Sequence, residues 1–149
     1  MEYRILVAED DKGLNQGIRL ALQSGGVVFD AAYTLEEARH LLYEKKPDMV
    51  ILDVNFPDGD GFSFLCTLRQ YSDIPVLMVT ANDMETDEVT GLALGADDYI
   101  TKPFSLMALR ARVENIRKHT SRHQSQLYFW QMNLQGILIQ LQARMYLGF

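Results

Sequence analysis

Short apolar runs alternate along the chain with longer stretches in which apolar residues recur every three to four positions. The runs are rich in Val, Ile and Leu and end in polar or turn residues, a pattern typical of strands buried in a parallel sheet. The predicted strands are residues 5–8, 27–29, 49–52, 76–79 and 98–101. Because most of these runs do not alternate with polar residues, we expect them to be covered on both faces.

The stretches between the strands carry apolar residues at the spacing of a helix face. Gly25-Gly26 ends the first helix, Thr34 is suited to N-cap the second, Pro47 stops the second, and Gly95 closes the fourth. The five apolar faces are Leu14, Ile18, Ala21 and Leu22; Leu35, Ala38, Leu41 and Leu42; Phe62, Leu65 and Leu68; Val89 and Leu92; and Leu106, Leu109, Val113 and Ile116. Five strand–helix units in succession predict an α/β fold, with a parallel sheet, helices on both faces and right-handed crossovers.

Length and composition limit the class of protein. With 149 residues, 48% hydrophobic and 23% charged, the chain is expected to form one soluble domain plus a tail. It lacks the roughly 20 consecutive apolar residues of a membrane span, and its N-terminus lacks the pattern of a secretory signal, so we expect no membrane partner and a cytoplasmic location. The single Cys66 excludes an intramolecular disulfide, and the net charge of −6 argues against a nucleic-acid clamp.

Polar residues follow four of the predicted strands at the point where each strand ends. They are Glu9, Asp10, Asp53, Thr80 and Lys102. Taken singly, each has an ordinary explanation as a surface acid, a turn residue, a helix cap or a solvated lysine. Because the carboxyl ends of parallel strands share one edge of the sheet, where such folds bind ligands, the set taken together favours a functional site.

The three acids of this set point to metal-assisted phosphoryl chemistry. Neighbouring carboxylates repel and raise one another's pKa, and a divalent cation with oxygen ligands, most simply Mg²⁺, resolves that repulsion. Lys102 and Thr80 would add a positive charge and a hydroxyl donor for the oxygens of a phosphoryl group. Asp53 is then the evident nucleophile, and a carboxylate that accepts a phosphoryl group forms a reactive acyl phosphate suited to a signal.

These residues resemble the receiver domain of two-component response regulators, over residues 1 to about 120. The family pattern is an acidic pair after the first strand, an acceptor Asp after the third, Thr or Ser after the fourth and Lys-Pro after the fifth. Here these are Glu9-Asp10, Asp53, Thr80 and Lys102-Pro103. The fold expected is an α/β doubly wound, flavodoxin-like sheet of five parallel strands in the order 2-1-3-4-5.

The resemblance also implies a partner, a metal and a switch. Asp53 would accept a phosphoryl group from a phosphohistidine on a sensor histidine kinase. Asp10 and Asp53 would bind Mg²⁺ directly, Glu9 through a water molecule, and Asn55 through its backbone carbonyl. On phosphorylation Thr80 would move toward the phosphoryl group and Tyr99 would turn inward behind it.

Residues 91–104 resemble the OmpR/PhoB subfamily of transcription regulators most closely. In that subfamily phosphorylation favours a homodimer through the fourth helix, fifth strand and fifth helix. The matching positions are the apolar Val89, Leu92 and Ala111, with Asp97, Asp98 and Arg112 for exchanged ion pairs. Glu88 and Ala108 depart from the usual basic and acidic residues, so one interface salt bridge is expected to be missing.

The end of the chain predicts a linker and a short extension. Residues 121–126 are polar, and residues 127–149 resemble the opening strands of the subfamily's winged-helix effector domain. No complete winged helix fits into that length, so DNA would be bound only through an effector domain that this chain lacks. We expect the extension to be disordered, packed on the receiver or paired between chains.

Two other functions compete with that of a phospho-accepting signalling domain, which is not an enzyme in the usual sense. One is a Mg²⁺-dependent phosphatase-like hydrolase that uses Asp53 as its nucleophile; Asn55 disfavours it, since such enzymes usually place a second acid two residues beyond the nucleophile. The other is a receiver-fold interaction module that is never phosphorylated, which the full set of chemical residues argues against.

Overall fold

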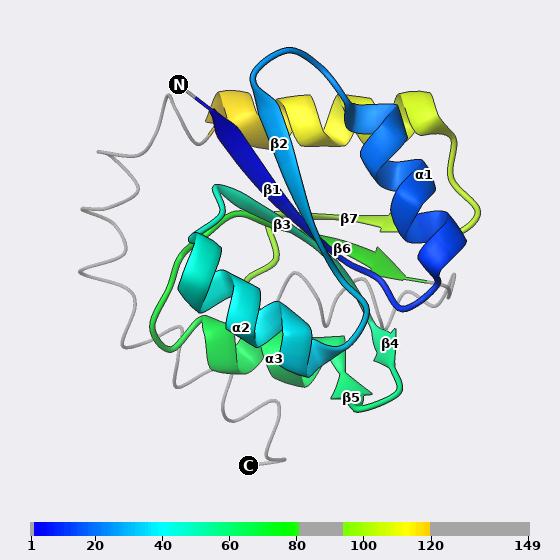
Figure 1. The fold of residues 1–149 in the computed structure, drawn as a ribbon. Helices are drawn as coiled ribbons and strands as arrows, with labels where there is room; N and C mark the ends of the chain where they lie inside the picture. The colour runs from blue at the N-terminus through cyan, green and yellow to red at the C-terminus, as the bar shows by residue number, and fades with distance from the viewer. Residues whose placement is uncertain (1, 81–93, 120–149) are drawn as a thin grey trace. The chain divides into compact units, whose positions relative to one another are not determined.

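Five strands form a parallel sheet (Figure 1) in a computed structural model that describes residues 2–80 and 94–119. Its strands are β1 (Tyr3–Ala8), β2 (Val27–Ala32), β3 (Met49–Asp53), β6 (Val76–Thr80) and β7 (Asp98–Thr101), in the order β2-β1-β3-β6-β7. Counted along the chain these five strands follow the order 2-1-3-4-5. The α/β fold predicted from the sequence, with its flavodoxin-like topology, is therefore confirmed.

Three helices have defined bounds: α1 (Lys12–Leu22), α2 (Leu35–Lys45) and α3 (Gly61–Leu68). Residues 106–119 are also helical. The side chains of Asp11, Thr34 and Asp60 cap the three bounded helices by accepting a hydrogen bond from a backbone N–H in the first turn. The helix predicted around Val89 and Leu92 lies outside the described residues.

The sheet is buried on both faces, as its continuous apolar runs predict. In Figure 1, α2 and α3 cover one face, and α1 and residues 106–113 cover the other. One hydrophobic cluster joins alternate residues of the central strands to α2 and α3. Its members include Leu6, Ala8, Val50, Leu52, Val76 and Met78 of the strands with Ala38, Leu65 and Leu68 of the helices. The intervening residues Ile5, Val7, Ile51, Leu77 and Val79 are equally buried and, by the alternation of a strand, point to the opposite face.

Strand β2 and the segment after β3 differ from the sequence prediction. Strand β2 continues to Ala32, three residues beyond the predicted end, paired in register with β1, and its Asp30 forms an ion pair of 2.7 Å with Arg4 of β1. A half-buried edge strand can carry such a pair, and the charge hides the strand from a search for apolar runs. The segment directly after β3 forms an antiparallel hairpin of β4 (Asn55–Phe56) and β5 (Gly59–Asp60).

The chain divides into two units, Met1–Val113 and Glu114–Phe149, and the first contains the sheet and every candidate site residue. The linker expected at 121–126 and the extension expected at 127–149 lie outside the described residues. Among the helices that the structure describes, none has the length and apolar character needed to cross a membrane.

Candidate functional site

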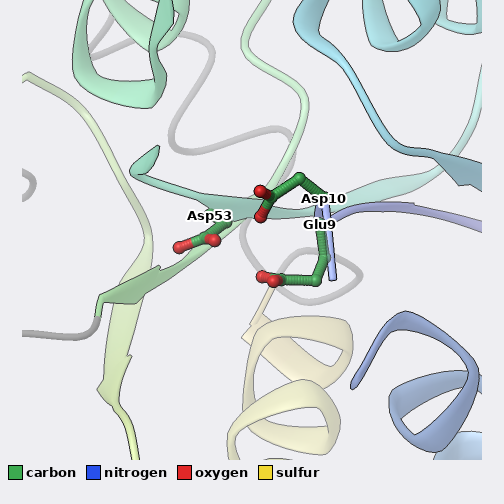
Figure 2. Close-up of side chains that lie close together, drawn as sticks. All are labelled: Glu9, Asp10 and Asp53. Atoms are coloured by element: carbon green, nitrogen blue, oxygen red, sulfur yellow. The ribbon is translucent and has the colours of Figure 1, made fainter. Parts of the chain in front are cut away.

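Three carboxylates meet at the carboxyl edge of the sheet. Glu9 and Asp10 follow β1, and Asp53 is the last residue of the adjacent β3. One oxygen from each residue lies within 4.8 Å of the others, and Figure 2 shows the three side chains converging on the same space. Strands β1 and β3 flank the point where the strand order reverses, so the acids lie where doubly wound sheets bind their ligands.

The burial of the three acids differs. The side chains of Glu9 and Asp53 are almost inaccessible, with relative exposures of 2% and 3%, whereas Asp10 is exposed. Two carboxylates in a nearly dry environment are unfavourable unless cations or hydrogen-bond donors compensate them. The site therefore needs positive charge, and the described residues supply only part of it.

Lys102 provides that part. Its Nζ donates to Glu9 Oε1 and Oε2 at 3.3 and 3.2 Å and to Asp53 Oδ2 at 3.2 Å. Lys102 follows β7, and its backbone N–H donates to the Thr80 carbonyl at the end of β6, at 2.7 Å. The peptide bond from Lys102 to Pro103 is cis. One lysine thus binds both buried acids from the far side of β6.

The electrostatics of the site show an excess of negative charge. Burial, together with a hydrogen bond and charge repulsion from Asp53, raises the pKa of Glu9 to about 8, although Lys102 acts in the opposite direction. Burial alone would lower the pKa of Lys102, but the Asp53 and Glu9 carboxylates raise it overall. With Lys102 as its cation, the cluster still retains a proton on Glu9 near neutral pH.

The donor set fits a hard divalent cation. Carboxylate oxygens from three residues, close together and short of positive charge, are the ligands that Mg²⁺ prefers. A cation bound there would take over the charge compensation that a proton on Glu9 otherwise supplies. The acidic cluster of Glu9, Asp10 and Asp53 thus offers the ligands of a magnesium site.

The turn after Asp53 holds the carboxylate of Asp53 in place. Asp53 Oδ1 accepts a hydrogen bond of 2.7 Å from the N–H of Val54, and the Val54 carbonyl accepts one of 2.6 Å from the N–H of Gly61. A Cβ on Gly61 would collide with the carbonyl oxygen of Asp53, so only glycine permits this close approach. Asn55 lies in the same turn, exposed at the start of β4.

Thr80 and Tyr99, the predicted switch residues, lie on adjacent strands. Thr80 is the last residue of β6, with a relative exposure of 2%, and is in register with Thr101 of β7. Tyr99 of β7 is half-buried and packs against the cluster beneath α2 and α3. The ζ-carbon of Arg112 lies 5.9 Å from the centre of the Tyr99 ring, within the range of a cation–π contact.

The predicted dimer residues that the structure describes make bonds within one chain. Arg112 donates to Asp98 Oδ1 and Oδ2 at 3.0 and 3.1 Å. Asp97 Oδ2 accepts from the backbone N–H of Val76 at 2.8 Å and from Arg69 at 3.2 Å. Ala111 is exposed, and Val89 and Leu92 lie outside the described residues.

Beside the site lies a buried polar residue that the sequence pattern does not identify. Asn15 is fully buried on α1, where it shares the buried face with Ile18 and Leu22. The sequence prediction began that face at Leu14, which is only half-buried, and did not include Asn15. Asn15 lies three positions before Ile18 and seven before Leu22, a spacing that puts all three on one helix face. This spacing is the signal that could have identified Asn15.

The fold and this site define a receiver, a phospho-accepting signalling module. Residues 5–114 match the response regulator receiver domain family. The chain therefore belongs to that family, and a receiver domain implies a histidine kinase as its partner in a two-component system.

Solved structures agree with this assignment. The receiver domain of a Francisella response regulator is 36% identical, with a TM-score of 0.75, and the match covers 80% of this chain and 99% of the other. A two-component response regulator from Clostridium difficile is 29% identical, with a TM-score of 0.76 and coverages of 80% and 98%. The BeF3-activated receiver domain of DrrB is 29% identical, with a TM-score of 0.71 and coverages of 79% and 99%.

Proposed function

We propose that this receiver accepts a phosphoryl group from a phosphohistidine of a sensor histidine kinase onto Asp53 and thereby switches a dimerisation surface in a regulator of transcription. The observation that carries the proposal is the position of Asp53, a buried carboxylate at a strand end, 3.2 Å from Lys102 and beside Glu9 and Asp10. The phosphohistidine is made from ATP, so we place the protein in the cytoplasm.

In the proposed transfer, an oxygen of Asp53 attacks phosphorus, the phosphorus–nitrogen bond breaks, and the histidine nitrogen leaves with the electron pair. The developing negative charge on the phosphoryl oxygens requires fixed positive charge and donors. Lys102 already lies against Asp53, and Thr80 supplies a hydroxyl from the end of the neighbouring strand. Both residues would contact the phosphoryl oxygens and hold the acyl phosphate.

The proposed ligands for Mg²⁺ are Asp10 and Asp53 directly, Glu9 through water, and the backbone carbonyl of Asn55. When bound, the cation would neutralise charge on the acceptor carboxylate and the phosphoryl oxygens. Asp10 is the exposed member of the acidic cluster and can exchange ligands with solvent, whereas buried Glu9 is already held by Lys102. This difference in burial supports a direct role for Asp10 and an indirect one for Glu9.

In this proposal, the surface that responds to phosphorylation is formed by β7 and the helix at 106–119. Thr80 and Tyr99 would transmit phosphorylation to that surface, and Asp97, Asp98 and Arg112, with Val89, Leu92 and Ala111, would form the dimer. The segment 91–104 supports an OmpR/PhoB-like regulator of transcription. DNA binding would require an effector domain in addition to residues 1–120.

The test of the proposal is covalent labelling. The protein is incubated with Mg²⁺ and acetyl phosphate, a small phosphodonor, and its intact mass is measured beside those of Asp53→Asn and Asp73→Asn. Asp53→Asn preserves the shape of the acceptor, while Asp73 is an exposed aspartate away from the acidic cluster and serves as the matched control. We expect wild type and Asp73→Asn to gain the mass of one phosphoryl group and Asp53→Asn to gain none.

Two results would contradict the proposal. Equal labelling of Asp53→Asn would show that another residue accepts the phosphoryl group. Sustained release of phosphate over many turnovers, without an adduct on wild type, would instead indicate a hydrolase.

A further inference from the structure

One buried polar side chain has no part in the proposed phosphoryl transfer. The polar or charged side chains buried in the described part of the chain are Glu9, Asp53, Thr80 and Asn15. The first three belong to the candidate site. Asn15 lies on α1 with a relative exposure of 0%, at a position where a helix packed on a sheet usually carries an aliphatic residue. A buried amide is unfavourable unless its hydrogen bonds are made, so its partners indicate its role.

Those partners are the ends of two strands. Asn15 Nδ2 faces three backbone carbonyls, those of Val7 and Glu9 at 3.1 Å each and that of Ala32 at 3.4 Å. Its Oδ1 accepts a hydrogen bond of 2.8 Å from Arg19 Nε, one turn further along α1. Three acceptors on one side and a guanidinium on the other allow a single orientation of the amide.

The bond to the Glu9 carbonyl has a direct geometric consequence. That oxygen belongs to the peptide unit that joins Glu9 to Asp10, so holding it fixes the plane from which both acidic side chains leave the backbone. On the other side, the N–H of Glu9 donates to the Ala32 carbonyl at 3.0 Å. Asn15 contacts that same Ala32 oxygen, and therefore ties α1, β1 and β2 together at the turn that carries two of the three carboxylates.

We propose that Asn15 is a positioning residue for the divalent-cation site: its amide, oriented by Arg19, holds the Glu9–Asp10 peptide so that both carboxylates face Asp53. The inference rests on the proposed magnesium site but not on phosphoryl transfer. Residues that orient metal ligands from outside the coordination shell typically change metal affinity by about 10- to 100-fold when replaced. A role confined to core stability would leave the affinity of the folded protein unchanged.

The test is isothermal titration calorimetry with Mg²⁺ alone, on the full chain, at a temperature where every variant is folded. Asn15→Asp is nearly isosteric and retains an acceptor for Arg19, but it turns an oxygen toward the three carbonyls in place of the donor. We expect its Mg²⁺ affinity to fall by about tenfold or more. Arg19→Ala leaves the Asn15 donor but frees the amide to rotate, so we expect a smaller loss in the same direction.

The matched control is Ile18→Ala. Ile18 is buried on α1 three residues after Asn15, and its truncation destabilises the fold by leaving a cavity. No hydrogen bond of the Glu9 carbonyl depends on this side chain, so we expect Ile18→Ala to bind Mg²⁺ as wild type does once it is folded. Thermal melts without Mg²⁺ would rank the variants by stability independently of their affinity.

The outcomes separate this inference from the proposed function. Wild-type affinity in Asn15→Asp, or an equal loss in Asn15→Asp and Ile18→Ala, would overturn the positioning role. If Asn15→Asp does not fold, unchanged affinity in Arg19→Ala overturns it instead. Mg²⁺ binding without phosphoryl labelling would overturn the proposed function alone, and absence of Mg²⁺ binding by wild type would overturn both.

Discussion

The ammonium of Lys102 lies 3.2 Å from the Asp53 carboxylate, although 49 positions separate the two residues in the sequence. Lys102 follows β7, and Asp53 ends β3, with β6 between them in the sheet. The lysine side chain therefore reaches across the end of β6, where its own backbone N–H is bonded to Thr80. Asp53, Lys102 and Thr80 are thus joined through the ends of three adjacent strands.

Replacement of Lys102 by Met should slow phosphorylation while the fold is retained. The change removes a fixed positive charge beside the phosphoryl oxygens, and the loss of one such donor typically costs about 100- to 1,000-fold in rate. The rate of adduct formation from acetyl phosphate, followed by intact mass, measures the effect. Lys45→Met, on the exposed last turn of α2, is the matched control. Equal rates in the two variants would remove Lys102 from the reaction.

The stability of the metal-free protein should depend on pH through Glu9. The folded pKa of about 8 is above the ordinary value of 4.5, so the folded state holds a proton that the unfolded state releases. This contribution is fully present below about pH 4.5 and is lost as pH rises to about 8, with a slope of at most about 1.4 kcal/mol per pH unit for one proton. Denaturant unfolding in EDTA from pH 5 to 8.5 would measure it.

Glu9→Gln provides the control for this pH dependence. Glutamine keeps the size of the side chain but does not titrate. As pH rises, the free energy of unfolding of wild type should therefore fall relative to that of the variant. Added Mg²⁺ should reduce this pH-dependent fall in the stability of wild type, because a cation stabilises ionised Glu9. A pH-independent difference would contradict the raised pKa.

The hairpin that follows Asp53 should stabilise the start of α2. Asp58 Oδ1 and Oδ2 accept hydrogen bonds of 3.0 Å each from the N–H groups of Leu35 and Glu36. These bonds lower the pKa of the Asp58 carboxyl, so the cap is present above the ordinary pKa of 3.8 and is lost as pH falls through the lowered value. In Asp58→Ala we expect faster amide hydrogen exchange at Leu35 and Glu36.

Thr34→Ala is the matched change for the same helix end. Thr34 accepts from the N–H of Glu37 at 3.1 Å, so its removal should accelerate exchange at Glu37 and spare the two amides held by Asp58. Identical exchange patterns in the two variants would show that the hairpin does not cap the helix independently.

The bonds between Arg112 and Asp98 within one chain should limit what this pair adds to dimerisation. A dimer that exchanges the pair between chains replaces one partly exposed ion pair with another, and such pairs contribute about 0 to 1 kcal/mol. If the proposed phosphodonor-dependent dimer forms, Arg112→Ala should therefore weaken it by no more than about fivefold. Sedimentation velocity with and without acetyl phosphate measures this, with the exposed Arg110→Ala as the control. Complete loss of the dimer in Arg112→Ala alone would show that the pair does more than exchange partners.

The order of strands, helices and chemical residues along the chain was predictable from the sequence because these features depend on local patterns. Apolar runs locate β3 and β6 to within one residue, and the residue at the end of each run is Asp53 or Thr80. Once successive strand–helix units predict a parallel sheet, the strand ends must share one edge. This is why the acidic cluster could be predicted without coordinates.

Only the tertiary structure decided which groups at that edge touch. The bond of Lys102 to both Glu9 and Asp53, the cap that Asp58 places on α2, and the three carbonyls gathered by Asn15 all join residues from different elements. Sequence periodicity reports which face of a helix or strand is buried, but not which polar atom meets which across a gap of about 3 Å, the distance that hydrogen bonds require. Those distances follow from the packing of helices on the sheet, and this packing determines how strongly Glu9 keeps its proton and how firmly the Glu9–Asp10 turn is held.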